Sequence, residues 1–309
     1  MLDPHQLLPA WQWYAAAAVF GALWGSFANV VIVRWPREMS VLRPASHCMS
    51  CDRPVRWYDN VPVVSYLVLR GRCRECGSRF SPRYVVVEAA LALLSVGVIR
   101  LTLLADPPSF QLGLAEYFVL FAFCWAMVTA GLIDLETYWI PDVIPLPGIV
   151  VGLAANAFLL DLGWREPLIA AAGGYAAIRL LFVDGYRLLT GMPGMGEGDA
   201  RLVAMIGAFF GIRGALFALF AGAIQGLIAG VVIRARRRRG LDSEPVFEEE
   251  IEEEKLEEDG DGPATDPGFL KSRIPFGPFL ALGALEHLFV GPWVVERYTA
   301  GIARLLGME

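Results

Sequence analysis

The sequence predicts an all-α membrane protein with about eight transmembrane helices and a small cytoplasmic zinc-binding loop domain. Three observations support this prediction. Hydrophobic residues make up 56% of the 309 residues, the apolar residues gather in long runs nearly free of charge, and four of the five cysteines lie in one polar loop. Soluble domains average about 45–50% apolar residues, whereas uncharged runs of about 20 residues are long enough to cross a bilayer as helices.

Eight apolar spans are expected. The span at residues 201–211 is the shortest, and Gly211 and Gly214 predict a turn that joins it to the next span, so seven spans is the alternative. The expected spans are residues 11–33, 84–104, 114–133, 143–160, 168–186, 201–211, 214–233 and 275–290.

The distribution of arginine predicts the orientation. Residues 34–83 hold ten arginines against four acidic residues, and residues 234–239 hold five more arginines. Basic loops stay in the cytoplasm, so eight spans place both termini outside and the connections at 134–142 and 187–199 inside. Because the basic residues lie beside apolar runs, they indicate a membrane surface and not nucleic acid as the partner.

The same features divide the chain into five segments. Residues 1–33 form the first transmembrane helix, 34–83 a Cys-rich cytoplasmic domain, and 84–239 a membrane-embedded domain. Residues 240–271 predict a disordered spacer, because twelve of the 32 acidic residues lie between Asp242 and Asp261. Residues 272–309 combine the last transmembrane helix with an amphipathic helix at 293–306 that is expected to lie at the membrane interface.

Four cysteines form two C-x-x-C pairs: Cys48 with Cys51, and Cys73 with Cys76, separated by 21 residues. This spacing is typical of a tetrahedral zinc site, and a cytoplasmic location keeps thiols reduced. The site would be structural, because the loop is too small to build its own core. Two redox-sensitive disulfides are the alternative. Cys124 lies within an apolar run and is expected to be a core or lipid-facing residue.

Two acidic residues stand at the ends of predicted spans on the same side of the membrane. Asp134 ends the third span, and Asp199 opens the sixth. Two neighbouring carboxyl groups that share one proton can hydrolyse a peptide bond, because the ionised group activates water and the protonated group donates to the carbonyl oxygen. Gly196 and Gly198 precede Asp199 and would let the backbone approach an extended substrate. The pattern therefore predicts an aspartyl protease.

Other interpretations of these acidic residues stay open. Either Asp142, interpreted as a helix N-cap, or Glu136 could replace Asp134 in the pair. An ion-coupled transporter would also carry acidic residues within the membrane, although such residues tend to lie near the midplane. A scaffold that uses zinc and the acidic spacer to bind partners would tolerate the loss of both aspartates.

Several short motifs give the chain a recognisable family resemblance. It resembles the type IV prepilin peptidases, membrane enzymes of bacterial pilus and secretion systems. The matching stretches are residues 25–32 (GSFANVVI), 47–51 (HCMSC), 56–66 (RWYDNVPVVSY), 70–77 (RGRCRECG), 81–84 (SPRY), 133–134 (ID), 140–142 (IPD) and 194–199 (GMGEGD).

The resemblance implies a catalytic pair of Asp134 and Asp199. It also implies cleavage of prepilin and pseudopilin leader peptides at the cytoplasmic face of the bacterial inner membrane. Members of the family often methylate the new N-terminus with S-adenosylmethionine, an activity linked to the first span and the cysteine loop. Many relatives carry lysine where this chain has Arg201, and the acidic stretch 240–271 is unusual for the family.

Overall fold

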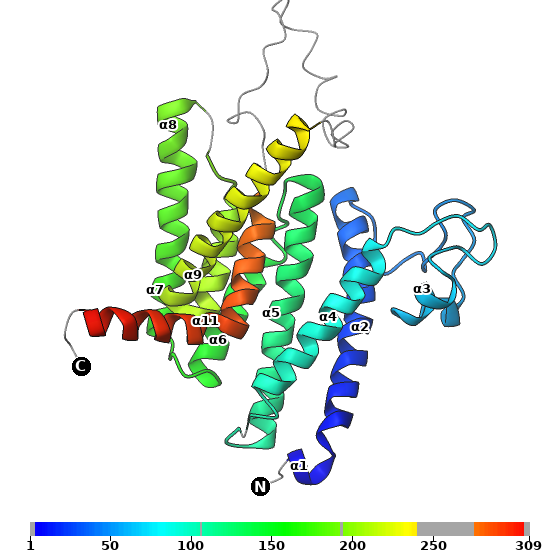
Figure 1. Ribbon diagram of the computed structural model, residues 1–309, viewed down its shortest axis with the longest axis horizontal. Helices are drawn as coiled ribbons and strands as arrows, with labels where there is room; N and C mark the ends of the chain where they lie inside the picture. Colours follow the sequence, from blue (N-terminus) through cyan, green and yellow to red (C-terminus); the bar gives the residue numbers. More distant parts are fainter. Residues whose placement is uncertain (1–3, 106, 192–193, 240–274, 306–309) are drawn as a thin grey trace, which may run out of the picture.

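A computed structural model describes residues 4–105, 107–191, 194–239 and 275–305 of the chain. Helices are the only extended regular elements of the described residues, which otherwise hold turns, irregular loops and two isolated β-bridges in the Cys-rich loop, so the all-α prediction is confirmed. Figure 1 shows the helices standing side by side, with this loop at one flank. The predicted spacer at 240–271 lies outside the described residues.

The long helices follow the predicted spans closely. Five of them are long and apolar enough to cross a membrane, and α6 is a shorter apolar helix. In chain order the bundle consists of α2 (Ala10–Arg34), α4 (Arg83–Leu101), α5 (Phe110–Thr137), α6 (Pro145–Phe158), α7 (Arg165–Ala177) continued by η3 (Ile178–Gly185) and α8 (Tyr186–Thr190), α9 (Glu197–Arg238) and α11 (Gly277–Leu305). The short elements are α1 (Pro4–Leu7), η1 (Trp35–Arg37), η2 (Trp57–Asp59) and α3 (Val64–Val68).

A sharp break divides α9 into the two predicted spans. Gly211 has non-helical dihedral angles, with φ 65° and ψ −164°. Glycine adopts positive φ without a steric cost. At the break, carbonyl groups of the first half lose the backbone N–H donors that a continuous helix would supply. The side-chain amide of Asn156 in α6 donates instead to the carbonyls of Ala208 and Phe209, each at 2.9 Å. Eight spans are thus consistent with the structure.

Close helix contacts show how the two halves of α9 run. In the first half, Gly207 lies against Ala170 of α7, and Gly174 lies against Val203, so these helices are antiparallel. In the second half, Gly222 lies against Phe279 of α11. Small residues allow membrane helices to approach this closely. The two halves therefore form a hairpin between α7 and α11.

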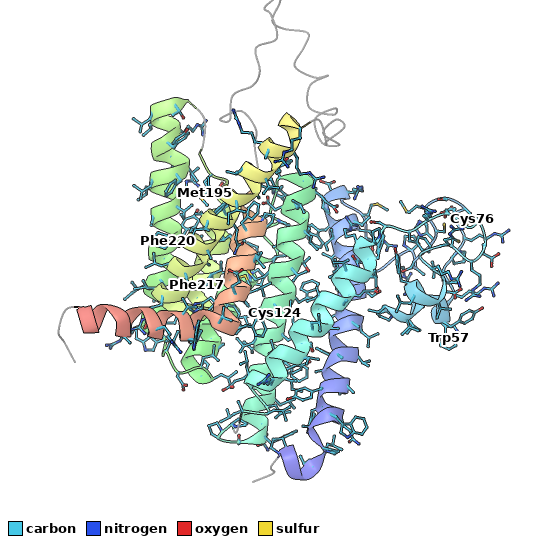
Figure 2. The ribbon with its side chains drawn as sticks, viewed as in Figure 1. Trp57, Cys76, Cys124, Met195, Phe217 and Phe220 are labelled. Carbon is cyan, nitrogen blue, oxygen red and sulfur yellow. The ribbon has the colours of Figure 1, made fainter. Side chains whose placement is uncertain are left out.

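Aromatic and small residues fill the centre of the bundle. α5 buries thirteen residues, including Cys124 at its middle, which Figure 2 shows among the helices. The Phe123 ring packs against Phe209 and Phe210, with centroid separations of 4.7 and 4.9 Å. α5 is thus the central helix, and it carries Asp134 at the end of the bundle where α9 begins.

The last helix changes direction near its only internal proline. α11 contains Pro292, and Figure 1 shows its final portion turned across the axis of the bundle. Proline removes a backbone donor and kinks helices. The predicted amphipathic segment from residue 293 falls on this portion, as far as the described chain extends.

Candidate functional site

Asp134 lies in the last turn of α5 and is 6% exposed. Its Oδ2 accepts a hydrogen bond from the backbone N–H of Gly277, at 3.0 Å. Gly277 opens α11, and a Cβ atom at this position would lie 2.5 Å from the same oxygen. Glycine is therefore required where the start of α11 touches Asp134.

Asp199 lies in the first turn of α9 and is 7% exposed. Its Oδ2 accepts from the backbone N–H of Gly196, at 3.2 Å, and the positive end of the helix dipole also favours a carboxylate here. Its Oδ1 is buried and has no hydrogen-bond partner among the described residues. An unpartnered buried oxygen is costly unless it serves a ligand or a reaction.

The two aspartates belong to one site. Their carboxyl groups are close enough to interact electrostatically. Ile140, from the segment between α5 and α6, contacts the positions of both Gly198 and Gly277, so one side chain packs beside both acids. Figure 2 places Met195, just before α9, near this end of the bundle. Two buried carboxyl groups in this arrangement can share a proton and activate water.

The neighbouring acidic residues have other partners. Asp142 forms an ion pair with Arg201, and Glu136 forms one with Arg83. The interpretation of Asp142 as an N-cap was wrong, because α6 begins at Pro145 with Ile144 as its cap residue. Pro145 is the first residue of α6, a position that proline favours because its missing N–H needs no partner there. Both acidic residues therefore carry a compensating cation, unlike the buried pair.

The two glycines predicted to bind substrate have different surroundings. Gly196 is exposed and donates its N–H to Asp199. At Gly198 a Cβ atom would lie 2.9 Å from the Cβ of Ile140, so close packing accounts for glycine there. Substrate binding by either glycine stays a prediction.

Sequence reasoning missed Gly277 as a member of the site. A sequence signal for Gly277 was present in Pro275-Phe276-Gly277-Pro278, whose glycine and prolines interrupt regular structure just before the last apolar run. Such a motif predicts a turn, but only the three-dimensional structure brings its backbone N–H to an acidic residue 143 positions earlier.

A second site lies in the Cys-rich loop. The Sγ atoms of Cys48, Cys51, Cys73 and Cys76 all lie within 4.8 Å of one another, and those of Cys48 and Cys76 are 3.8 Å apart. Four sulfurs around a zinc ion at about 2.3 Å would be separated by about 3.8 Å. All five cysteines of the chain are free thiols. The predicted cluster can thus hold a metal ion.

The two cysteine pairs sit on equivalent turns. After each C-x-x-C comes a residue with positive φ, Asp52 at 56° and Gly77 at 73°. In each turn the first cysteine's N–H donates to a carbonyl five residues ahead: Cys48 to Arg53 at 2.9 Å, and Cys73 to Ser78 at 2.8 Å. The hydrogen bond to the Ser78 hydroxyl, followed by backbone N–H groups, lowers the pKa of Cys48 to about 6. A thiolate is the form that binds metal.

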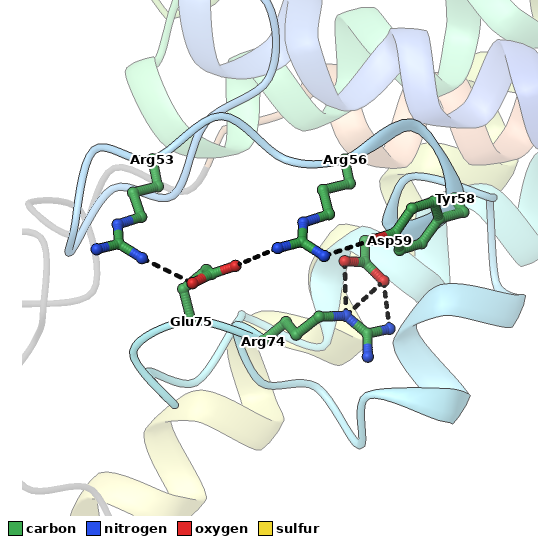
Figure 3. Close-up of polar contacts among 6 residues, drawn as sticks. All are labelled: Arg53, Arg56, Tyr58, Asp59, Arg74 and Glu75. Atoms are coloured by element: carbon green, nitrogen blue, oxygen red, sulfur yellow. Dashed lines mark hydrogen bonds and ion pairs between the residues drawn. The ribbon is translucent and has the colours of Figure 1, made fainter.

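Ion pairs connect the two turns (Figure 3). Glu75 accepts from Arg53 at 2.7 Å and from Arg56 at 2.9 Å. The Arg74 guanidinium donates to both oxygens of Asp59, which holds the pKa of that carboxyl below its usual range. These contacts are partly exposed and supplement the cysteine cluster.

A bundle of apolar helices with two buried carboxyl groups at one end defines a polytopic membrane protein with the groups that an aspartyl peptidase needs. Residues 19–101 match the Bacterial Peptidase A24 N-terminal domain, and residues 121–231 match the Type IV leader peptidase family. No solved structure matches the chain.

Curated relatives cover nearly the whole sequence. The chain is 32% identical to a prepilin leader peptidase/N-methyltransferase of Myxococcus xanthus, over 94% of this chain and 93% of the relative. It is 31% identical to the protein of that name from Pseudomonas putida, over 94% of each, and 34% identical to that from Neisseria gonorrhoeae, over 72% of this chain and 83% of the relative. The chain belongs to the type IV leader peptidase family and is a multi-pass membrane protease.

Proposed function

We propose that this protein removes the leader peptides of prepilins and pseudopilins with Asp134 and Asp199, and then methylates the new N-terminus. The observation that carries the proposal is the pair of buried carboxyl groups at one end of the bundle. Family membership supports both activities, because the curated relatives are named for leader cleavage and N-methylation.

The pair would act as a proton-sharing dyad. The ionised carboxylate takes a proton from water as the water attacks the scissile carbonyl carbon. The protonated partner donates to the carbonyl oxygen and later supports departure of the amine. The N–H groups of Gly277 and Gly196 fix one oxygen of each acid, so the other oxygens are left to face the substrate and water.

The placement of charge supports a cytoplasmic site in the bacterial inner membrane. The arginine-rich loop between α2 and α4 lies at the end of the bundle that holds Asp134. Basic loops remain cytoplasmic. A substrate whose apolar helix lies in lipid would therefore present its leader junction at this border.

The Cys-rich loop would hold one structural zinc ion, because four converging thiols match its preferred ligand set. S-adenosylmethionine would supply a methyl group carried on sulfonium sulfur. Neither group takes part in peptide cleavage as derived from the dyad.

Cleavage of a purified prepilin in membranes tests the dyad. Asp134→Asn and Asp199→Asn should each reduce cleavage about 10³-fold or more, because neither variant can share a proton between two carboxyl groups. Mass spectrometry of the product N-terminus reports cleavage and methylation together. Asp161→Asn, the same substitution at an exposed site, serves as the matched control.

Asp142→Asn separates the proposed pairing from its alternative. Retained cleavage in Asp142→Asn alongside loss in Asp134→Asn supports the proposal. The reverse pattern, or full cleavage by both Asp134→Asn and Asp199→Asn, rejects it.

A further inference from the structure

A cavity separate from the carboxyl pair lies between α2, the start of α4 and the Cys-rich loop. Its volume is about 320 Å³, within the range of pockets that enclose small organic ligands. Its walls combine residues of all three parts, and the fold therefore creates the cavity by docking the loop against the two helices. The lining residues used below are Ser26, Arg34, Tyr66, Phe80, Tyr84 and Glu88.

Glu88 supplies an uncompensated carboxyl group to this cavity. It is buried on α4, where Oε2 accepts from the Val63 N–H at 2.7 Å and the Ser26 hydroxyl also donates to the carboxyl group. None of the ion pairs among the described residues includes Glu88. The other lining carboxylate, Asp59, is neutralised by Arg74. A buried carboxylate without a cationic partner is suited to a cationic ligand.

The opposite charge stands further along the same wall. Arg34 is buried and donates from Nη1 to the carbonyls of Ser40 and Pro44, at 3.2 and 2.8 Å. Ser26, which contacts Glu88, precedes Arg34 by eight positions on α2, or about 12 Å along a helix. The cavity therefore offers an anionic and a cationic group at separate places, as a zwitterionic ligand requires.

Aromatic rings complete the lining. Tyr66 comes from the loop, Tyr84 from the first turn of α4, and Phe80 from the segment between them. Aromatic faces stack on nucleobases and attract methylated cations. A ligand that joins a purine, a sulfonium centre and an amino acid would therefore match the cavity: the rings suit the purine, Glu88 suits the sulfonium charge, and Arg34 suits the carboxylate.

The cavity also lies near the peptidase site. Tyr84 and Glu88 are on the first turns of α4, and Arg83 at the start of that helix forms an ion pair with Glu136 of α5. Glu136 follows Asp134 by two residues. The cavity and the carboxyl pair thus lie toward the same end of the bundle, and the Arg83–Glu136 ion pair joins α4, which lines the cavity, to α5, which carries Asp134.

We propose that this cavity binds the methyl donor, a sulfonium nucleoside of the S-adenosylmethionine type, and that Glu88 faces its cationic portion. The inference rests on the proposed function and names the residues that would serve its second step. In that step the free N-terminal amine attacks the methyl carbon, a C–N bond forms and the C–S bond breaks. The electron pair passes to sulfur, and the amine releases a proton to water.

Direct binding to the purified full-length chain in nanodiscs tests this assignment. Calorimetry with S-adenosylmethionine and with S-adenosylhomocysteine, which lacks the positive charge on sulfur, separates charge recognition from simple fit. We expect Glu88→Gln to weaken binding of the sulfonium compound about tenfold, and to weaken binding of the neutral thioether by less than about threefold. Glu38→Gln makes the same change at an exposed residue outside the cavity lining and is the matched control.

A second variant keeps the test decisive if Glu88→Gln does not fold. Val30 lines the cavity from α2, and Val30→Trp should fill the space and abolish binding of both compounds. Unchanged binding in the folded variants, or equal weakening of both compounds by Glu88→Gln, overturns the assignment.

The mass spectrum of a prepilin reaction distinguishes this inference from the function on which it rests. In Glu88→Gln, a ratio of methylated to cleaved product that falls about tenfold or more below that of the unmodified protein supports the donor site. Asp199→Asn should bind the donor as the unmodified protein does, although it does not cleave. Loss of donor binding in Asp199→Asn would contradict the separation of the two sites.

Discussion

The helical bundle and the Cys-rich loop are stabilised in different ways. Within the bundle, α5 alone buries thirteen residues, and small residues bring helices into backbone contact, as where Gly283 meets Ala218. Within residues 38–82 only Cys48, Ser65 and Gly71 are buried, and Trp57 is 83% exposed. Figure 2 shows Trp57 and Cys76 on the flank, away from the helices.

This difference predicts that the loop, and not the bundle, would depend on a bound metal ion. Packing among apolar side chains can hold the bundle in its membrane, whereas the loop has too few buried apolar residues to offset the entropy of ordering its chain. The loop instead has four thiols, a few ion pairs and its contact with α2 and α4. Breaking each kind of contact in turn should therefore affect the two regions unequally.

Loss of the metal site should have the largest effect. Zinc removal by a chelator, or Cys73→Ser, should unfold the loop, because structural zinc sites contribute on the order of 10 kcal/mol to small domains. Hydrogen exchange followed by mass spectrometry should show residues 38–82 losing protection while α5 and α9 retain it. Cys124→Ser, at a buried cysteine outside the cluster, is the control and should leave bound zinc unchanged. Equal loss of protection in both regions would contradict the comparison.

Gly277→Ala should have an intermediate effect that is confined to the bundle. The new Cβ atom would lie 2.5 Å from Asp134 Oδ2 and 3.0 Å from Ile140 Cδ1, so the start of α11 must move away. Cleavage should fall about tenfold, equivalent to about 1.4 kcal/mol in transition-state stabilisation, as measured by initial rates on one prepilin. At Gly173 an added Cβ meets no atom within 4 Å, so Gly173→Ala is the matched control. Equal rates for the two variants would remove Gly277 from the site.

Glu75→Gln should have the smallest effect. Glu75 joins Arg53 and Arg56, but its side chain is 32% exposed, and exposed ion pairs contribute only about 0–1 kcal/mol. Thermal unfolding of the zinc-loaded protein should shift slightly, and zinc content should stay the same. A loss of zinc equal to that of Cys73→Ser would show that the ion pairs, and not the thiols, organise the loop.

The apolar pattern predicted the fold well because membrane helices are long and carry few charges. The residue order also placed the break in α9, since Gly211 and Gly214 interrupt one long apolar run. It did not show that η3 is a π-helix or that Asn156 would satisfy the carbonyls beside the break. Those features depend on the neighbouring helix and have no local signal.

The candidate sites were predictable to different degrees. The spacing of the four cysteines predicts their cluster because metal ligands follow typical spacings, and the structure brings all four together. Asp134 and Asp199 could be paired from their positions at span ends, and their catalytic role stays a proposal. The cavity beside Glu88 could not be predicted, because its walls come from segments up to 62 residues apart, from Ser26 to Glu88.

The hydrogen bond between Gly277 and Asp134 has a consequence for biosynthesis. Its two partners are 143 positions apart, and α11 leaves the ribosome after every other helix of the bundle. A nascent chain that has inserted α5 and α9 therefore still lacks the amide that orients one of the two acids. On the proposed role of Asp134 and Asp199, proteolysis would therefore begin only after α11 has inserted and its Gly277 N–H has reached Asp134.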